Sequence, residues 1–170
     1  MKELQKKQLE LDKFIYNKQG IPLSDLKLRE KIIALDVELS EFANEIEFFK
    51  YWKVNKGKGK DKIIEEACDC LHFILSIANA VKAELNYIDM YLEGETLTDM
   101  YLCIKSFLFK DFLDCGYLYN EIDKKAEEVI DIIFNILIKM IKATGFTYED
   151  LIKEYDKKYE INIQRQREGY

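Results

Sequence analysis

Residues that interrupt helices are scarce in this chain, and this scarcity restricts its fold more than any other feature. The 170 residues include one proline, Pro22, and seven glycines, so long stretches contain nothing that breaks a helix. Apolar residues recur through these stretches at the helical period, with almost no sustained alternation of the kind that strands show. The sequence therefore predicts an all-α protein, with one domain over residues 1–170.

Helix caps and breakers mark the bounds of the expected helices. The pattern predicts helices over about 3–18, 24–52, 62–85, 88–117 (one or two helices), 121–143 and from 147 onward. The first ends at the breaker that begins with Gly20, and Ser24 can cap the second. Gly145 can adopt the left-handed conformation that closes a helix. Thr147 and Asp150 have the spacing of a capping box.

The charge and apolar pattern of the chain exclude two classes of partner. The formal net charge is −6, whereas a protein that binds duplex nucleic acid needs a basic face. The most apolar segment, 129–141, is interrupted by Asp131, Asn135 and Lys139. A membrane span of about 20 apolar residues does not tolerate such interruptions. We therefore expect no nucleic-acid partner and no membrane partner.

The N-terminal segment and the cysteines favour a cytoplasmic location. Residues 1–14 are charged throughout and lack the apolar stretch of a secretory signal. The chain has four cysteines, namely Cys68, Cys70, Cys103 and Cys115. Their spacing suits neither a disulfide framework nor a CxxC zinc site, so we expect reduced thiols.

A helical wheel divides the 24–52 helix into a buried side and a solvent side. The apolar stripe that we expect in the core comprises Leu35, Leu39, Phe42, Ile46 and Phe49. The expected solvent side comprises Asp36, Ser40, Asn44 and Glu47. Between them lies a flank on which acids alternate with apolar residues, and this flank carries Glu38 and Glu41.

Carboxylates three residues apart form two matching pairs, Glu38 with Glu41 and Glu66 with Asp69. Residues at i and i+3 project from adjacent turns of one helix face, so two such helices packed together would place four carboxylates around one point. Magnesium prefers oxygen ligands, whereas zinc or copper would favour histidine or thiolate. The pairs therefore predict a Mg²⁺ site with more than one ion. The alternative is a non-enzymatic helical scaffold whose acids are solvated.

These carboxylate pairs and their surroundings resemble the all-alpha nucleoside triphosphate pyrophosphatases, and among them the dimeric dUTPases of phages, bacteria and trypanosomatids. The matching segments are QLELD at 8–12, ALDVELSEFANEIEFFKYWK at 34–53, EEACDCLHF at 65–73 and YDKKYEINIQRQREGY at 155–170. The resemblance implies a helical bundle whose four-helix core is completed in a homodimer, and hydrolysis of dUTP and dUDP to dUMP. Apolar residues in 101–112 and 129–141 give such a dimer physical room.

The resemblance also implies roles at the phosphate end of the substrate. The residues that match the family's metal ligands are Glu38, Glu41, Glu66 and Asp69, and Glu41 is the candidate general base. Residues 155–170 match a tail that covers the phosphates, and the phosphate-binding positions in it are Lys158, Asn162 and Arg165. The composition of this tail predicts mobility until substrate orders it. Lys53 is either a phosphate contact or ordinary surface charge.

At the nucleoside end, the resemblance implies that Phe73 stacks on uracil and that His72 contacts the deoxyribose. Gln8 and Asp12 match an early motif near base and sugar, and Trp52 is either a substrate contact or a packing residue. A filled pocket would exclude the methyl group of thymine. The nearest alternative is a MazG-type or dCTP-hydrolysing pyrophosphatase, which shares the carboxylates but lacks the C-terminal motif.

Overall fold

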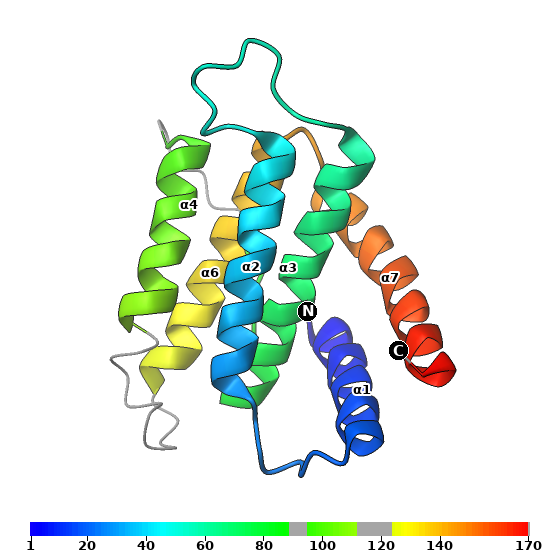
Figure 1. Cartoon of the computed structure of the whole chain (residues 1–170). Helices are drawn as coiled ribbons and strands as arrows, with labels where there is room; N and C mark the ends of the chain where they lie inside the picture. Colours follow the sequence, from blue (N-terminus) through cyan, green and yellow to red (C-terminus); the bar gives the residue numbers. More distant parts are fainter. Residues whose placement is uncertain (89–94, 112–123, 170) are drawn as a thin grey trace.

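The computed structural model describes residues 1–88, 95–111 and 124–169, and these form an all-α bundle (Figure 1). Its elements are α1 (Lys2–Gln19), α2 (Leu28–Ile46), α3 (Lys60–Val81), α4 (Leu97–Ser106), the π-helix η1 (Phe107–Asp111), α6 (Lys124–Ala143) and α7 (Tyr148–Glu168). No strand occurs among the described residues, which confirms the predicted fold class. Cys115, Gly94 and the expected helical residues within 89–94 and 112–123 lie outside the described residues.

Helix α3 is the centre of the bundle. It contacts α2, α6, α1 and α7, with α4 and α6 on one side and α1 and α7 on the other (Figure 1). Its last four turns are buried almost all round, since Ile74, Leu75, Ile77 and Ala78 have no exposed surface. Polar residues on this helix are therefore held by neighbours on several sides.

The predicted ends of three helices are confirmed. Gly20 closes α1 in the left-handed conformation, with φ 66. Gly145 follows α6 with φ 89. Thr147 caps α7, and Thr147 and Asp150 form both hydrogen bonds of the capping box.

The predicted bounds of the second helix were wrong at both ends. Ser24 does not cap it, because the chain enters α2 through Lys27 in the left-handed conformation with φ 49. The helix ends at Ile46 instead of continuing to residue 52, because Glu47 also has a left-handed conformation, with φ 61. Phe49 consequently leaves the core stripe and is 40% exposed.

Glu47, expected on the solvent side, is buried. Its residue exposure is 2%, and its carboxylate accepts hydrogen bonds from Lys50 Nζ at 2.9 Å and from Lys53 Nζ. These bonds lower the pKa of Glu47 to about 2. The lysine-rich loop is therefore fastened to the end of α2 by its own ammonium groups.

The C-terminal segment expected as a mobile tail is helical in the structure. Residues 155–168 continue α7, which packs on α1 and α3. Tyr155 has no exposed surface and Lys158 is 8% exposed. Burial of this face fastens the segment to the bundle in the absence of substrate.

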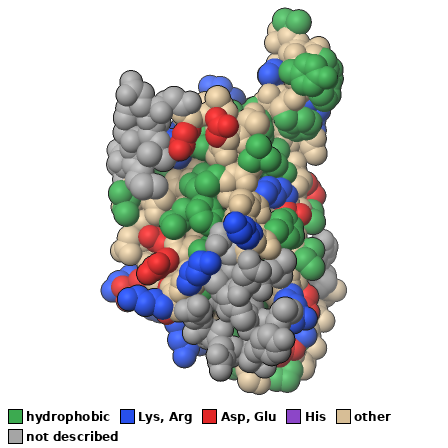
Figure 2. Space-filling model, turned by 90° about the vertical axis from the view of Figure 1, so that its left-hand side faces the viewer, with side chains coloured by type: hydrophobic (Ala, Val, Ile, Leu, Met, Phe, Trp, Pro, Cys, Tyr) green, Lys and Arg blue, Asp and Glu red, His purple; other side chains and the backbone are tan. Residues whose placement is uncertain are grey.

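The loop between α2 and α3 projects from the bundle (Figure 1). Figure 2 shows hydrophobic side chains on this projecting loop. Its most exposed apolar residues are Tyr51 (89%), Trp52 (65%) and Val54 (96%). Among the described helices, none has the length and apolar character that a transmembrane span requires.

Candidate active site

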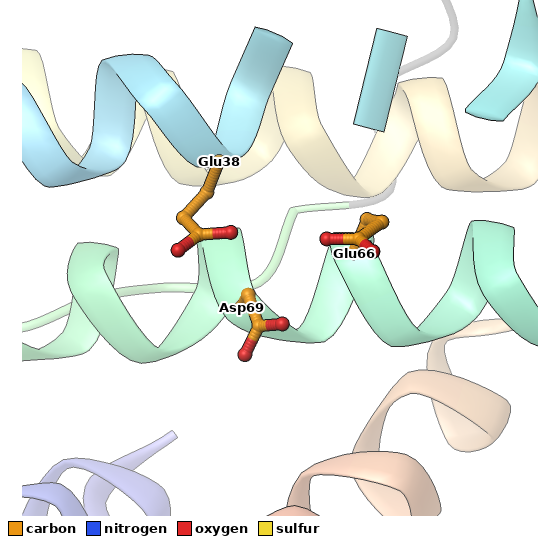
Figure 3. Close-up of side chains that lie close together, drawn as sticks. All are labelled: Glu38, Glu66 and Asp69. Carbon is orange, nitrogen blue, oxygen red and sulfur yellow. The ribbon is translucent and has the colours of Figure 1, made fainter. Parts of the chain in front are cut away.

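Three carboxylates meet where α2 packs on α3. Glu38 points from α2 toward Glu66 and Asp69 of α3 (Figure 3), and each residue offers an oxygen within 4.8 Å of the others. Glu41 is exposed and is not part of this group. Its charge nevertheless raises the pKa of both Glu38 and Glu66, so it lies close by. The structure thus brings together three of the four predicted ligands, with the fourth beside them.

The environment of these carboxylates disfavours negative charge. Burial, followed by the charges of Asp69, Glu41 and Glu66, raises the pKa of Glu38 to about 7. Burial is also the main cause that raises the pKa of Glu66 and of Asp69. Like charges in a partly buried site favour the protonated form unless a cation offsets them.

The donor set fits a hard divalent cation. The group consists of carboxylates alone, which is the ligand type that Mg²⁺ selects. One positive charge is already present, since Lys158 Nζ donates a hydrogen bond to Asp69 and lies 3.7 Å from Glu65 Oε1. The predicted metal ligand Asp69 is therefore paired with a cationic group of α7.

A cavity of about 530 Å³ adjoins the carboxylates, and its volume is in the range of small-molecule sites. It brings together most of the predicted site residues, namely Gln8, Asp12, Glu38, Asp69, His72, Phe73, Asn162 and Arg165. Leu11, Ile15 and Phe73 supply apolar surface, while α7 contributes Asn162 and Arg165. One cavity therefore joins acidic, basic and apolar groups.

Two predicted substrate residues lie elsewhere. Of the described residues that line the cavity, none belongs to the loop after α2. Trp52 is 65% exposed and packs edge-on against Phe49 and Tyr51. Lys53 is bound to Glu47. Their roles toward substrate stay predictions.

Several residues that the sequence did not single out complete the site. Tyr155 donates a hydrogen bond to Gln8 Oε1 at 3.0 Å, and Ser76 donates to Asp12 Oδ2 at 2.5 Å. Lys31 Nζ lies 3.5 Å from the same Asp12 oxygen. Ser76 shares the stripe of Asp69 on α3, so its position was open to prediction. Tyr155 and Lys31 come from other helices, and no spacing signal connects them to Asp12 or Gln8.

Together the fold and the site define an all-α protein in which a cluster of carboxylates adjoins a cavity of small-molecule size. The family model dUTPase_2, described as dUTPase, matches residues 1–170. The chain therefore belongs to the all-α dUTPase family, and its activity is that of a dUTP diphosphatase. No curated protein matches the chain.

Replacing Glu38 with Gln should stabilise the metal-free protein at alkaline pH. Because the pKa of Glu38 rises from 4.5 to about 7 on folding, the folded state binds the proton more tightly, and wild-type stability falls as pH rises through this window. Glu38→Gln removes that loss. The side chain keeps some solvent exposure, so we expect a gain of about 1 kcal/mol at pH 8, or about 2–4 °C in Tm.

Thermal denaturation in a metal chelator at pH 4 and at pH 8 measures this effect. The gain should disappear at pH 4, where wild-type Glu38 is neutral as well. Glu128→Gln, which changes an exposed glutamate of α6, serves as the control and should leave Tm unchanged. A pH-independent gain in the Glu38 variant would contradict the assigned repulsion.

Replacing Lys158 with Met should strengthen divalent-cation binding to the nucleotide-free protein. The ammonium of Lys158 occupies an oxygen of Asp69, and Met keeps most of the apolar stem while removing the charge. Calorimetric titration with Mg²⁺ should give a Kd several-fold lower than that of the wild type. Lys157→Met, which changes a lysine paired with Glu154, is the matched control. Unchanged or weaker binding in Lys158→Met would show that the ammonium does not compete with the cation.

Proposed function

We propose that this chain hydrolyses dUTP and dUDP to dUMP with Mg²⁺ held by Glu38, Glu66 and Asp69, joined by Glu41. The observation that carries this proposal is the continuity of one cavity from Glu38 and Asp69 to the apolar surface around Phe73. The cavity thus has a charged end and a largely apolar end. A nucleotide is divided in the same way, into charged phosphates and a flat base.

The proposed orientation of the substrate follows from the charges that line the cavity. The phosphates lie toward Glu38 and Asp69, where bound Mg²⁺ would polarise phosphoryl oxygens and lower the pKa of a coordinated water. Arg165 and Asn162 face the same cavity from α7, and Lys158 reaches Asp69. These groups would offset phosphate charge that the metal leaves unpaired. Because dUDP has the same nucleoside and one phosphoanhydride bond, it is also a substrate.

Glu41 is the proposed general base. Its side chain is exposed yet near enough to raise the pKa of Glu38, so it can accept a proton from attacking water and pass it to solvent. Glu38 is less suited to this role, because it lies inside the three-carboxylate group, whereas Glu41 lies at the edge of that group and is open to solvent.

The nucleoside end of the cavity supports selection for uracil. Phe73 lines the cavity together with Leu11 and Ile15 of α1, and it is the proposed stacking partner of the base. An additional methyl group in a filled apolar slot typically costs about 1–3 kcal/mol. Thymine is therefore disfavoured by size.

Apolar residues on the outer face of α2 support a homodimer. Ile33 is 60% exposed and Val37 is 47% exposed, and Leu102 of α4 is 59% exposed. Exposed aliphatic side chains of this kind gather at protein interfaces. We propose that two copies associate through this face.

Sedimentation at micromolar concentration tests the dimer. The wild type should sediment as a dimer, and a Val37→Glu and Ile33→Glu double variant should sediment as a folded monomer. Glu substitutions at the exposed residues Leu9 and Ile161, away from this face, serve as the control. A wild type that is monomeric at this concentration would contradict the proposal.

A nucleotide panel tests the proposed reaction. With Mg²⁺, dUTP and dUDP should both yield dUMP, whereas dTTP should be turned over at least about tenfold more slowly. Without Mg²⁺, or in a Glu38→Ala and Asp69→Ala double variant, turnover should fall by at least about 100-fold. A control double variant, Glu10→Ala and Glu128→Ala, removes two exposed acids and should keep full activity. Equal or faster turnover of dCTP or dTTP would contradict the substrate assignment.

A further inference from the structure

A chain of hydrogen bonds lies beneath the nucleoside end of the cavity, and it begins at Asp12. The carboxylate of Asp12 accepts from Gln8 Nε2 at 2.8 Å and from Ser76 Oγ at 2.5 Å, with Lys31 Nζ at 3.5 Å. An ionised carboxylate can only accept hydrogen bonds. Gln8 must therefore direct its amide nitrogen toward Asp12.

This orientation of Gln8 determines what its other end can do. Gln8 Oε1 lies 3.0 Å from the hydroxyl of Tyr155 and 2.8 Å from Nδ1 of His72. A carbonyl oxygen is only an acceptor, so both neighbours must donate to it. His72 consequently carries its proton on Nδ1.

His72 is a neutral imidazole with one unprotonated nitrogen. Burial lowers the pKa of His72 to about 3, so the ring holds one proton at neutral pH. With that proton on Nδ1, Nε2 has a free lone pair and can only accept. The ring is held in place by stacking on Tyr155, at 4.4 Å between centroids and 27° between planes.

Nε2 of His72 is buried without a hydrogen bond from any described residue. The residue is 6% exposed and lines the cavity. A buried acceptor without a partner lowers the stability of the folded protein, and a ligand that brings a donor would remove this penalty. The cavity is one sign of a ligand at this place, and the unpaired nitrogen of His72 is a second sign that does not depend on the first.

We infer that Asp12 is a positioning residue that acts through Gln8 to hold His72 in the Nδ1–H tautomer, so that Nε2 recognises a hydrogen-bond donor of the nucleoside. The identity of this ligand rests on the proposed function, whereas the tautomer rests on the protein alone. A deoxyuridine nucleotide offers two donors, the 3′-hydroxyl and the imide N–H of uracil. Asp12 need not touch the substrate to influence its binding.

The tautomer can be measured directly, because the chain contains one histidine. Nitrogen-15 NMR of the labelled, ligand-free protein should show His72 with a protonated Nδ1 and an unprotonated Nε2. Asp12→Asn is isosteric but can donate to Gln8, which allows the amide to turn round. In this variant the Nε2–H tautomer should become populated. Ser76→Ala keeps the carboxylate of Asp12 and should retain the wild-type tautomer.

Two results would overturn the inference. One is an Nε2–H tautomer in the wild type, a measurement that requires no variant. The other is a wild-type tautomer in a folded Asp12→Asn protein. If Asp12→Asn does not fold, Gln8→Leu removes the same link, and an unchanged tautomer in that variant would overturn the inference equally.

Substrate analogues identify the donor. The 2′,3′-dideoxy and the N3-methyl analogues of non-hydrolysable dUTP each lack one donor, and the one that pairs with His72 should bind the wild type about tenfold more weakly. This penalty should shrink in Asp12→Asn. Undiminished binding of both analogues would refute donor recognition. Failure to turn over dUTP would instead refute the proposed function and leave the tautomer result intact.

Discussion

The mutual repulsion of Glu38, Glu66 and Asp69 is the constraint on which the site depends, and the packing of α2 on α3 imposes it. Glu38 is followed by Leu39, and Asp69 stands between Cys68 and Cys70, all three of which have no exposed surface. The backbones that carry the acids are therefore fixed by the core. The carboxylates cannot separate without disturbing that packing, so their repulsion is relieved either by a bound proton or by a nearby positive charge.

Two further helices bring polar side chains to the cavity beside this acidic centre. Helix α1 brings Gln8 and Asp12 against α3, and α7 brings Tyr155 and Lys158 to the same helix. The bond between Tyr155 and Gln8 joins residues 147 positions apart. Because α7 contacts both the carboxylates and the nucleoside end, its docking couples the two halves of the cavity.

The sequence predicted the features that are governed by local periodicity and short-range chemistry. The apolar stripe of α2 is buried at Leu35, Leu39 and Phe42, and the capping box at Thr147 is present. The carboxylate pairs were recognisable because the i, i+3 spacing fixes one helix face. These features depend on residues within a turn or two of one another.

Features that depend on distant contacts or on a single backbone angle could not be predicted. Glu47 looked solvent-facing on a continuous helix, but its left-handed conformation ends α2 and turns its carboxylate toward Lys50 and Lys53. The polar composition of 155–168 suggested mobility, yet Tyr155 and Lys158 are themselves buried and find hydrogen-bond partners on α1 and α3. Such partners follow from the tertiary arrangement, which no local pattern encodes.

A crystal structure with Mn²⁺ in place of Mg²⁺ and a non-hydrolysable dUTP analogue tests the central claim most directly. Anomalous density should lie within about 2–2.5 Å of carboxylate oxygens of Glu38, Glu66 and Asp69, with the phosphates of the analogue beside it. Density that is absent from this position, or that lies only at other acids, would contradict the assignment of these three carboxylates as the metal centre.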